Sequence, residues 1–217
     1  MLFYDRTDAG IKLAQFLLQE DEIIKNRKKI VVLSLVRGGV PVGDIISKII
    51  NCPHYPVVVK KISLPQHEEL AIGAVTSGEI YLNYNLIKRL RLRQKQIEEA
   101  VRQAKEEEKI YRNKFRPDLK KISEKTVIVV DDGVATGASV IAVSKSVRRA
   151  HADKIYLAVP VAPEDFDQEE DIKRNDGYGF DRAFILKKDP GFRSVGQYYS
   201  NFDQVSDAEV LEYFKKR

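Results

Sequence analysis

The chain carries its hydrophobic positions in blocks, and most polar positions lie between these blocks. Near-continuous apolar runs rich in β-branched residues cover 30–36, 56–59, 126–130, 155–159 and 183–186. Runs of this kind are typical of strands that are covered on both faces of a parallel sheet. The stretches between them carry helical patterns. Strands that alternate with helices predict an α/β fold with a mostly parallel sheet flanked by helices.

Five helices are predicted from the spacing of apolar residues and from helix-start signals. One of them follows Pro41, a residue that suits a first helical turn. The longest has Leu86, Leu90 and Ile97 on one face, and at its length it would span roughly 40 Å. The predicted helices cover residues 7–24, 42–50, 86–111, 139–149 and 208–214.

No sustained period occurs in residues 62–80, which contain Pro65, Gly73 and Gly78. Proline and glycine interrupt regular structure, so this segment is predicted to be a loop with a short strand at 79–82. No repeat, low-complexity tract or Gly/Ser linker divides the chain. Its 217 residues therefore predict one domain, 1–217, with a helical insertion at 86–116 and a C-terminal segment at 190–217.

Composition narrows the class of protein. Hydrophobic residues make up 43% of the chain, which is enough to offset the entropy of folding and excludes a disordered protein. No apolar run approaches the ~20 residues of a membrane span. The first residues lack a secretory-signal pattern, and the single cysteine, Cys52, cannot form an internal disulfide. We therefore expect a soluble, cytoplasmic protein.

The formal net charge of +5 suggests nucleic acid as a partner. However, residues 86–125 hold 14 Lys and Arg against 7 Asp and Glu, so this segment carries +7 and the remainder carries −2. Its basic and acidic side chains are interleaved, and it lacks the regularly spaced aromatic residues of single-strand-binding surfaces. We do not expect nucleic-acid binding. The apolar stripe of helix 86–111 could pack against a second copy, and we expect a homodimer.

The candidate chemistry lies in residues 126–139. A predicted strand ends at Asp131 and Asp132, and a Gly-rich loop, residues 133–139, then opens a helix. Ligands of open α/β sheets bind at the carboxyl ends of the strands. The amino end of a helix offers free N–H groups to a phosphate, glycines let the backbone approach it closely, and Thr136 and Ser139 can donate hydrogen bonds. The two aspartates suit sugar hydroxyls or a hard cation such as Mg²⁺.

The motif differs from two other phosphate-binding motifs, because the loop does not end in Gly-Lys-Ser/Thr and contains no Gly-x-Gly-x-x-Gly. Residues 129–139 resemble the phosphoribosyl-pyrophosphate (PRPP) motif of type I phosphoribosyltransferases. Arg37-Gly38-Gly39 resembles that family's pyrophosphate loop, and Lys60 and Lys61 match its basic position near pyrophosphate. Residues 35–40, 69–75, 131–137 and 195–199 together resemble a group of that family with the motif Asp-Asp-Gly-Val-Ala-Thr-Gly.

This resemblance implies transfer of the 5-phosphoribosyl group of PRPP to a nitrogen nucleophile, such as a nucleobase, with release of pyrophosphate. It implies Mg²⁺ bound through PRPP and no metal site of the protein's own. The catalytic residues would be Asp131 and Asp132 at the ribose and Lys61 at the pyrophosphate. The other substrate-binding residues would be Arg37, Gly38, Gly39, Lys60, Gly133, Val134, Ala135, Thr136, Gly137, Ala138, Ser139 and Tyr198.

The resemblance also implies that segment 62–80 closes as a lid and that residues 190–217 form a hood over the acceptor base. Phe192, Tyr198 and Tyr199 offer aromatic faces for that base. Two features leave alternatives open. Many members of the family have Thr-Thr-Gly where this chain has Ala135-Thr136-Gly137, so one phosphate donor is missing. Some proteins of this fold are nucleotide-sensing regulators that bind nucleic acid, and this is the alternative function.

Two further questions stay open at this level. Alternation along a strand points one of Lys60 and Lys61 toward the site and favours neither strongly, although we choose Lys61. The acceptor could be a purine, a pyrimidine or another nitrogen nucleophile.

Overall fold

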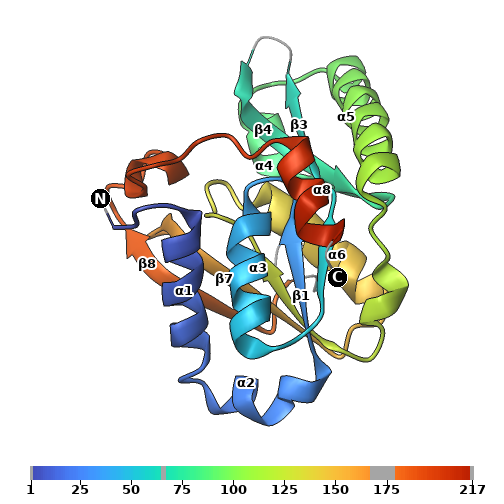
Figure 1. Ribbon diagram of the computed structural model, residues 1–217. Coiled ribbons are helices and arrows are strands. Elements are labelled where there is room, and N and C mark those ends of the chain that lie inside the picture. Colours follow the sequence, from blue (N-terminus) through green and yellow to red (C-terminus); the bar gives the residue numbers. More distant parts are fainter. Residues whose placement is uncertain (1, 65–66, 167–178, 216–217) are drawn as a thin grey trace.

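The computed structural model describes residues 2–64, 67–166 and 179–215. Its centre is a five-stranded sheet in the order β2-β1-β6-β7-β8, and all four neighbouring pairs are parallel. This arrangement confirms the predicted α/β class (Figure 1). The strands of this sheet are β1 (Ile30–Leu35), β2 (His54–Val57), β6 (Thr126–Val130), β7 (Lys154–Pro163) and β8 (Arg182–Asp189).

Helices cover both faces of the sheet. Helices α1 (Arg6–Leu17) and α3 (Gly39–Ile50) pack on one face, and α6 (Ala138–Arg149) packs on the other (Figure 1). The strands alternate between these two layers. In β1, Val31, Leu33 and Leu35 face α6, whereas Ile30 and Val32 face α1 and α3.

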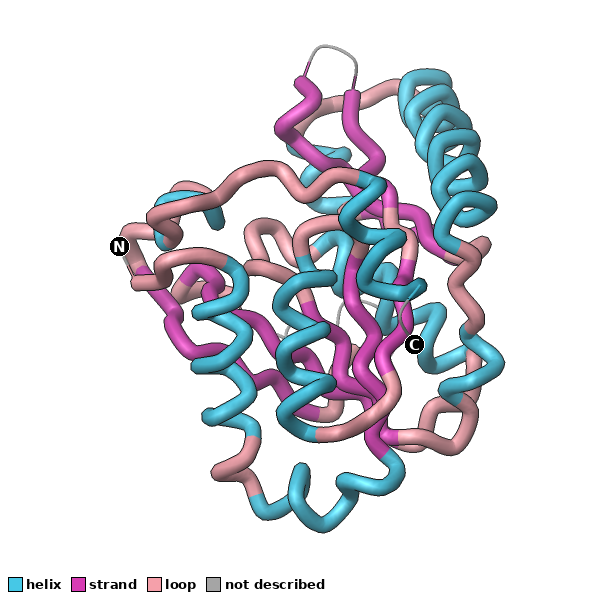
Figure 2. The backbone as a smooth tube through the Cα atoms, viewed as in Figure 1, coloured by secondary structure: helices cyan, strands magenta, loops and turns pink. Residues whose placement is uncertain are grey.

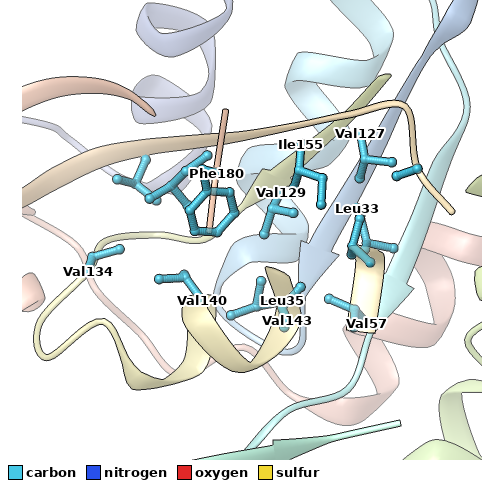
Figure 3. Close-up of a cluster of buried hydrophobic side chains, with 14 of the residues drawn as sticks. Leu33, Leu35, Val57, Val127, Val129, Val134, Val140, Val143, Ile155 and Phe180 are labelled. Carbon is cyan, nitrogen blue, oxygen red and sulfur yellow. The ribbon is translucent and has the colours of Figure 1, made fainter. Parts of the chain in front are cut away.

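The same alternation continues in β6 and explains why its sequence is apolar throughout. Val127 and Val129 pack with Val140 and Val143 of α6 (Figure 3), while Ile128 packs on the opposite side. All these residues are buried. Because β6 has a hydrophobic layer on each face, its interior positions 127–129 are all apolar, and Asp131 and Asp132 follow only where the strand ends.

Between β2 and β6 the chain forms a second, smaller group of strands and helices. Strands β3 (Lys60–Leu64), β4 (His67–Thr76) and β5 (Glu79–Leu82) form an antiparallel three-stranded sheet. Helices α4 (Tyr84–Arg89) and α5 (Gln94–Phe115) pack against it around a small apolar core. We call residues 60–115 the lobe.

The lobe corrects two predictions. Residues 62–80, predicted to be a loop, form most of the antiparallel sheet, with residues 65–66 outside the described part of the chain. The predicted long helix 86–111 is two helices, because the chain turns at Arg91 with a positive φ of 51°. Leu90 and Ile97, the stripe considered for a dimer interface, pack on the lobe's own sheet. The homodimer stays a prediction.

The other helix predictions need smaller changes. The predicted helix 7–24 is divided into α1 and the short α2 (Asp21–Asn26), with a 3₁₀ turn at Arg27–Lys29. Two further 3₁₀ turns cover Leu119–Ile122 and Val195–Tyr198, and α8 (Asp207–Lys215) confirms the predicted C-terminal helix. None of the described helices is long and apolar enough to cross a membrane.

Residues 2–4 lie beside residues 198–201 of the C-terminal segment, close to the N-terminus marked in Figures 1 and 2. Phe3 and Tyr199 form a parallel bridge, and the amides of Ser200 and Asn201 donate to the carbonyls of Phe3 and Tyr4 at 2.9 and 2.8 Å. From there the chain runs as a loop to α8, past the carboxyl ends of β1 and β6 (Figure 2). We call residues 199–206 the C-terminal strap.

Candidate active site

The candidate site lies where β1 and β6 end side by side. Strand β1 pairs with β2 on one side and with β6 on the other. The chain passes directly from β1 to β2, and it reaches β6 only after the lobe, so the strand order changes direction at β1 and β6. Such a change of direction opens a crevice at the carboxyl end of a parallel sheet. The loop Arg37-Gly38 follows β1, and Asp131 and Asp132 follow β6, so the two motifs identified in the sequence meet here.

One carboxylate oxygen of each aspartate accepts hydrogen bonds from other groups of the protein. The amide of Asp132 donates to Asp131 Oδ1 at 2.9 Å. Arg6 binds Asp132 Oδ2 with its Nε and its Nη2, both at 2.8 Å. Within the described residues, no hydrogen bond reaches the second oxygen of either group, and both side chains line the pockets described below. The pair therefore offers two acceptors from one edge of the sheet.

The loop after β1 presses closely against this pair. A Cβ on Gly38 would lie 2.1 Å from Asp132 Oδ2, and a Cβ on Gly39 would lie 2.5 Å from the Val130 carbonyl oxygen. Real Cβ atoms do not approach so closely, so only glycine fits at these two positions. Gly38 and Gly39 thus fix the spacing between the two motifs.

Burial dominates the electrostatics of the pair. Burial raises the pKa of Asp131 well above its ordinary value of 3.8, and the neighbouring Asp132 carboxylate raises it further. Burial also raises the pKa of Asp132, but the Arg6 charge and its hydrogen bonds oppose this increase. Lys61 lowers the pKa of both groups more weakly. The cations of the site therefore act against a strong tendency of the pair to hold protons.

The Gly-rich loop surrounds a pocket of about 240 Å³, which we call the loop pocket. Gly137, with φ of 76°, caps α6, and the Val134 amide is tied to the Val161 carbonyl at 2.9 Å. Ala135 and Thr136 are exposed, so their side chains and the first N–H groups of α6 face the pocket rather than the core. An anion fits this pocket, because a helix amino end carries partial positive charge.

A second pocket of about 410 Å³, the cationic pocket, adjoins the first. Lys61, Asp131, Asp132, Ser139 and Phe202 line both. The cationic pocket is lined by four basic side chains, which come from α1, from the loop after β1 and from β3: Arg6, Arg37, Lys60 and Lys61.

Lys60 and Lys61 have different surroundings within the cationic pocket. Lys60 Nζ lies 3.7 Å from the Tyr111 ring centroid and 3.3 Å from Glu107 Oε2. Lys61 is exposed, lines both pockets, and acts electrostatically on both aspartates. This arrangement favours Lys61 as the ligand-facing lysine.

None of the three aromatic residues that were predicted to face the acceptor base, Phe192, Tyr198 and Tyr199, lines either pocket. Tyr198 is buried, stacks on Phe192 with centroids 5.7 Å apart, and lines neither pocket. Tyr199 is also buried and donates its hydroxyl to the Asp132 carbonyl oxygen at 2.7 Å, so it supports the acidic pair from behind. Phe202, which the sequence analysis did not select, lines both pockets.

Arg6 is another residue of the site that the sequence did not reveal. It lies 126 positions from its partner Asp132 and carries no motif of its own. Its place follows from the start of α1, where Asp5 caps the helix by accepting from the Asp8 amide at 2.8 Å. Only the tertiary arrangement of the N-terminal segment could show it.

Among the residues that the structure describes, no group of three or more His, Cys, Asp or Glu side chains is placed to hold a metal ion. The acidic pair sits beside cations instead of beside further carboxylates or imidazoles.

The site combines the carboxyl edge of a parallel α/β sheet with an acidic pair and a Gly-rich loop. The family model of the phosphoribosyl transferase domain matches residues 4–183. The chain belongs to the phosphoribosyl transferase family.

Two proteins of Mycobacterium tuberculosis, from strains CDC 1551 / Oshkosh and ATCC 25618 / H37Rv, are 37% identical to this chain over 224 residues. Each is named "Putative phosphoribosyl transferase". The match covers 99% of this chain and 47% of each relative, so the chain spans about half the length of the curated relatives it matches.

Two solved structures share the fold. The crystal structure of TT1426 from Thermus thermophilus covers 100% of this chain and 99% of its own, with a TM-score of 0.70 and 29% identity. The AQ2163 protein from Aquifex aeolicus covers 85% of this chain and 74% of its own, with a TM-score of 0.52 and 11% identity. The second likeness shows the fold alone.

Proposed function

We propose that the protein transfers the 5-phosphoribosyl group of PRPP to a nitrogen nucleophile, with a nucleobase as the acceptor, and releases pyrophosphate. One observation carries the proposal. The acidic pair lies between a loop pocket suited to a phosphate and a cationic pocket suited to a larger polyanion. PRPP carries a phosphate, a sugar diol and a pyrophosphate in that order, and the three parts match these three surroundings.

The ribose would lie over the acidic pair. One oxygen each of Asp131 and Asp132 is available to the 2′- and 3′-hydroxyl groups, which donate hydrogen bonds to carboxylates. The 5′-phosphate would bind residues 133–139 at the amino end of α6. With Ala135 in place of a threonine, this phosphate would rely on backbone N–H groups, Thr136 and Ser139.

The pyrophosphate would bind Arg37, Lys61 and the backbone at Gly38. In the reaction the bond between the ribose C1 and the pyrophosphate oxygen breaks, a bond from the acceptor nitrogen to C1 forms, and the acceptor loses a proton to solvent or to a phosphate oxygen. Negative charge grows on the leaving group and positive charge on the sugar. Mg²⁺ bound through PRPP would neutralise part of the charge on the pyrophosphate.

The acceptor would lie on the strap side of the cationic pocket. Phe202 provides aromatic surface on this side, and Gln204 provides an amide that can both donate and accept hydrogen bonds, while Tyr111 of α5 lines another part of the pocket. An aromatic base with polar edges fits such a lining better than an aliphatic amine, because its faces are apolar and its rim is not. This view replaces Tyr198 with Phe202 as the aromatic contact.

Calorimetric titration with Mg·PRPP tests the proposal directly. We expect wild type to bind and Asp132→Asn to bind at least roughly tenfold more weakly, because a hydrogen bond to a charged group is lost. Asp153→Asn is the matched control, since Asp153 is exposed immediately before β7, at the opposite end of the sheet. No binding by wild type, or equal binding by Asp132→Asn, would contradict the assignment.

A pyrophosphate-release screen across nucleobases then tests catalysis. Release with one base class identifies the acceptor. Binding of Mg·PRPP without release on any base would instead favour the regulatory alternative. Part of the positive charge of α5 is paired with acids of the same helix, as Arg102 is with Glu99 and Glu106 at 2.6 and 2.8 Å.

A further inference from the structure

Arg6 joins three separate parts of the chain at one carboxylate. Its Nε and Nη2 each lie 2.8 Å from Asp132 Oδ2, and its Nη1 donates to the Asp203 carbonyl oxygen at 2.7 Å. The guanidinium carbon lies 3.9 Å from the centroid of the Phe202 ring. The Arg6 side chain is only 12% exposed, and it lines the cationic pocket. A half-buried arginine with these contacts is part of the architecture of the site.

The contacts of Arg6 restrict how Asp132 can turn. Both nitrogen atoms bind the same oxygen, Oδ2, and the backbone at Gly38 closes the other side of that oxygen. A carboxylate held in this way cannot exchange its two oxygens without breaking two charge-assisted hydrogen bonds. Oδ1 therefore keeps one position relative to the pocket.

We propose that Arg6 is a positioning residue for the ribose, which fixes Asp132 through Oδ2 so that Oδ1 can accept a sugar hydroxyl. The inference rests on the proposed function and adds a role for the N-terminal helix, which no motif assigns. Arg6 itself need not touch the substrate. Its partners Asp203 and Phe202 belong to the C-terminal strap, so the strap and the ribose site share one guanidinium.

The charged surroundings of Asp132 make this role measurable. Arg6 faces it from α1, Lys61 from β3 and Asp131 from the preceding position, while the Tyr199 hydroxyl binds its carbonyl. Burial raises the pKa of Asp132, and Arg6 provides the strongest opposing effect. Without Arg6 the pKa of Asp132 would rise further, and the carboxylate would be lost at a higher pH.

The first experiment measures the affinity of Mg·PRPP from pH 5 to pH 9 in wild type and Arg6→Met. We expect Arg6→Met to bind roughly tenfold to a hundredfold more weakly at pH 7, with its loss of affinity on acidification shifted to higher pH. Arg182→Met is the matched control: Arg182 also pairs with a carboxylate, Glu20 at 2.7 Å, and lies 4.5 Å from an aromatic ring, Phe184. It begins β8, away from the site, and should leave both readouts unchanged.

A second variant separates charge from geometry. Arg6→Lys keeps the positive charge but cannot bind Asp132 and Asp203 together, because an ammonium lacks the planar fork. We expect its pH profile to resemble that of wild type and its affinity to stay several-fold lower. Wild-type affinity and pH profile in a folded Arg6→Met, or wild-type affinity in Arg6→Lys if Arg6→Met does not fold, would overturn the proposal.

A ligand-free readout distinguishes this inference from the proposed function. Carbon NMR titration of the Asp132 side chain in the unliganded protein should show a higher pKa in Arg6→Met than in wild type. If wild type does not bind Mg·PRPP but this shift is present, the proposed function fails while Arg6 is still shown to control Asp132. If wild type binds and no shift occurs, the role of Arg6 fails and the proposed function stands.

Discussion

Asp207, at the start of α8, lies 3.4 Å from the Arg37 guanidinium in the loop after β1. The other carboxylate oxygen of Asp207 binds Lys114 of α5 at 2.5 Å. One acidic side chain thus connects the C-terminal helix, the lobe and the loop proposed to bind pyrophosphate. If pyrophosphate binds Arg37 as proposed, Asp207 would compete with it for the same guanidinium.

Asp207→Asn is expected to tighten the binding of pyrophosphate by roughly two- to fivefold. The substitution removes a negative charge beside Arg37 of the cationic pocket, and the effect is modest because the Arg37–Asp207 pair is partly exposed. Calorimetric titration with Mg·pyrophosphate measures it, and Asp181→Asn, which removes the partner of Arg148 on the opposite side, is the control. Weaker binding would show that Asp207 instead holds Arg37 in a productive position.

Asp131→Asn is expected to stabilise the protein at pH 7 while abolishing PRPP binding. The pKa of Asp131 is raised above 3.8 in the folded protein. As the pH rises above 3.8, the unfolded chain loses this proton more readily than the folded protein, so the free energy of unfolding decreases until the pH passes the folded pKa. Asparagine does not ionise, so the free energy of unfolding of Asp131→Asn lacks this decrease. The gain in thermal stability should therefore shrink as the pH falls toward 3.8.

Thermal unfolding at pH 7 and at pH 4.5 measures this effect, and each kcal/mol corresponds to about 2–4 °C for a chain of this size. Asp153→Asn serves again as the exposed control. A midpoint for Asp131→Asn at or below that of wild type at pH 7 would mean that Lys61 and Arg6 already neutralise the burial of Asp131.

Gly38→Ala is expected to displace the acidic pair without unfolding the sheet. The added Cβ would lie 2.1 Å from Asp132 Oδ2, so the carboxylate must move away from Arg6 or the loop must shift. We expect the affinity for Mg·PRPP to fall roughly tenfold or more, since two charge-assisted hydrogen bonds depend on that position. Gly191→Ala, whose Cβ would meet Asp189 Oδ1 at 3.3 Å, is the matched glycine control.

The two neighbouring lysines should respond differently to removal of their charge. Lys61→Met is expected to weaken Mg·PRPP binding roughly tenfold, because Lys61 lines both pockets and an ammonium near a pyrophosphate acts in a partly desolvated site. Lys60→Met should cost roughly threefold or less, because Lys60 is engaged by Tyr111 and Glu107. The reverse order would mean that Lys60 leaves those partners when the ligand binds.

The sequence predicts the parts of this molecule that depend on local patterns. The strand at Thr126–Val130, the acidic pair after it and the helix that opens at Ala138 each follow from neighbouring residues: apolar β-branched runs, loop glycines and a helix start. Parallel strands place their carboxyl ends at one edge, so the meeting of Arg37 with Asp131 also follows, although 94 positions separate them.

The helices of the lobe and its strand β5 were expected from the sequence, but strands β3 and β4 were not, because Gly73 resembles a strand breaker. Gly73 lies within β4, and a Cβ there would approach the Tyr81 carbonyl oxygen to 2.1 Å. Close packing of two backbones requires the glycine, yet in the sequence it resembles a strand breaker. The turn at Arg91 could not be predicted because no glycine signals it, and a non-glycine residue rarely adopts a positive φ. The roles of Arg6 and Asp207 could not be predicted from the sequence, because they follow only from contacts between distant parts of the chain.

The strap has a consequence for protein synthesis. The five parallel strands are complete at Asp189, whereas Phe202, Gln204 and Val205 of the cationic pocket follow later in the chain. Because amino-terminal parts emerge from the ribosome first, the sheet can form before the pocket is enclosed. A nascent chain stalled at Asp189 would carry the acidic pair and the Gly-rich loop, but Arg6 would lack its partners Phe202 and Asp203. Retention of ribosome-bound chains on immobilised PRPP would thus report release of the strap rather than formation of the sheet.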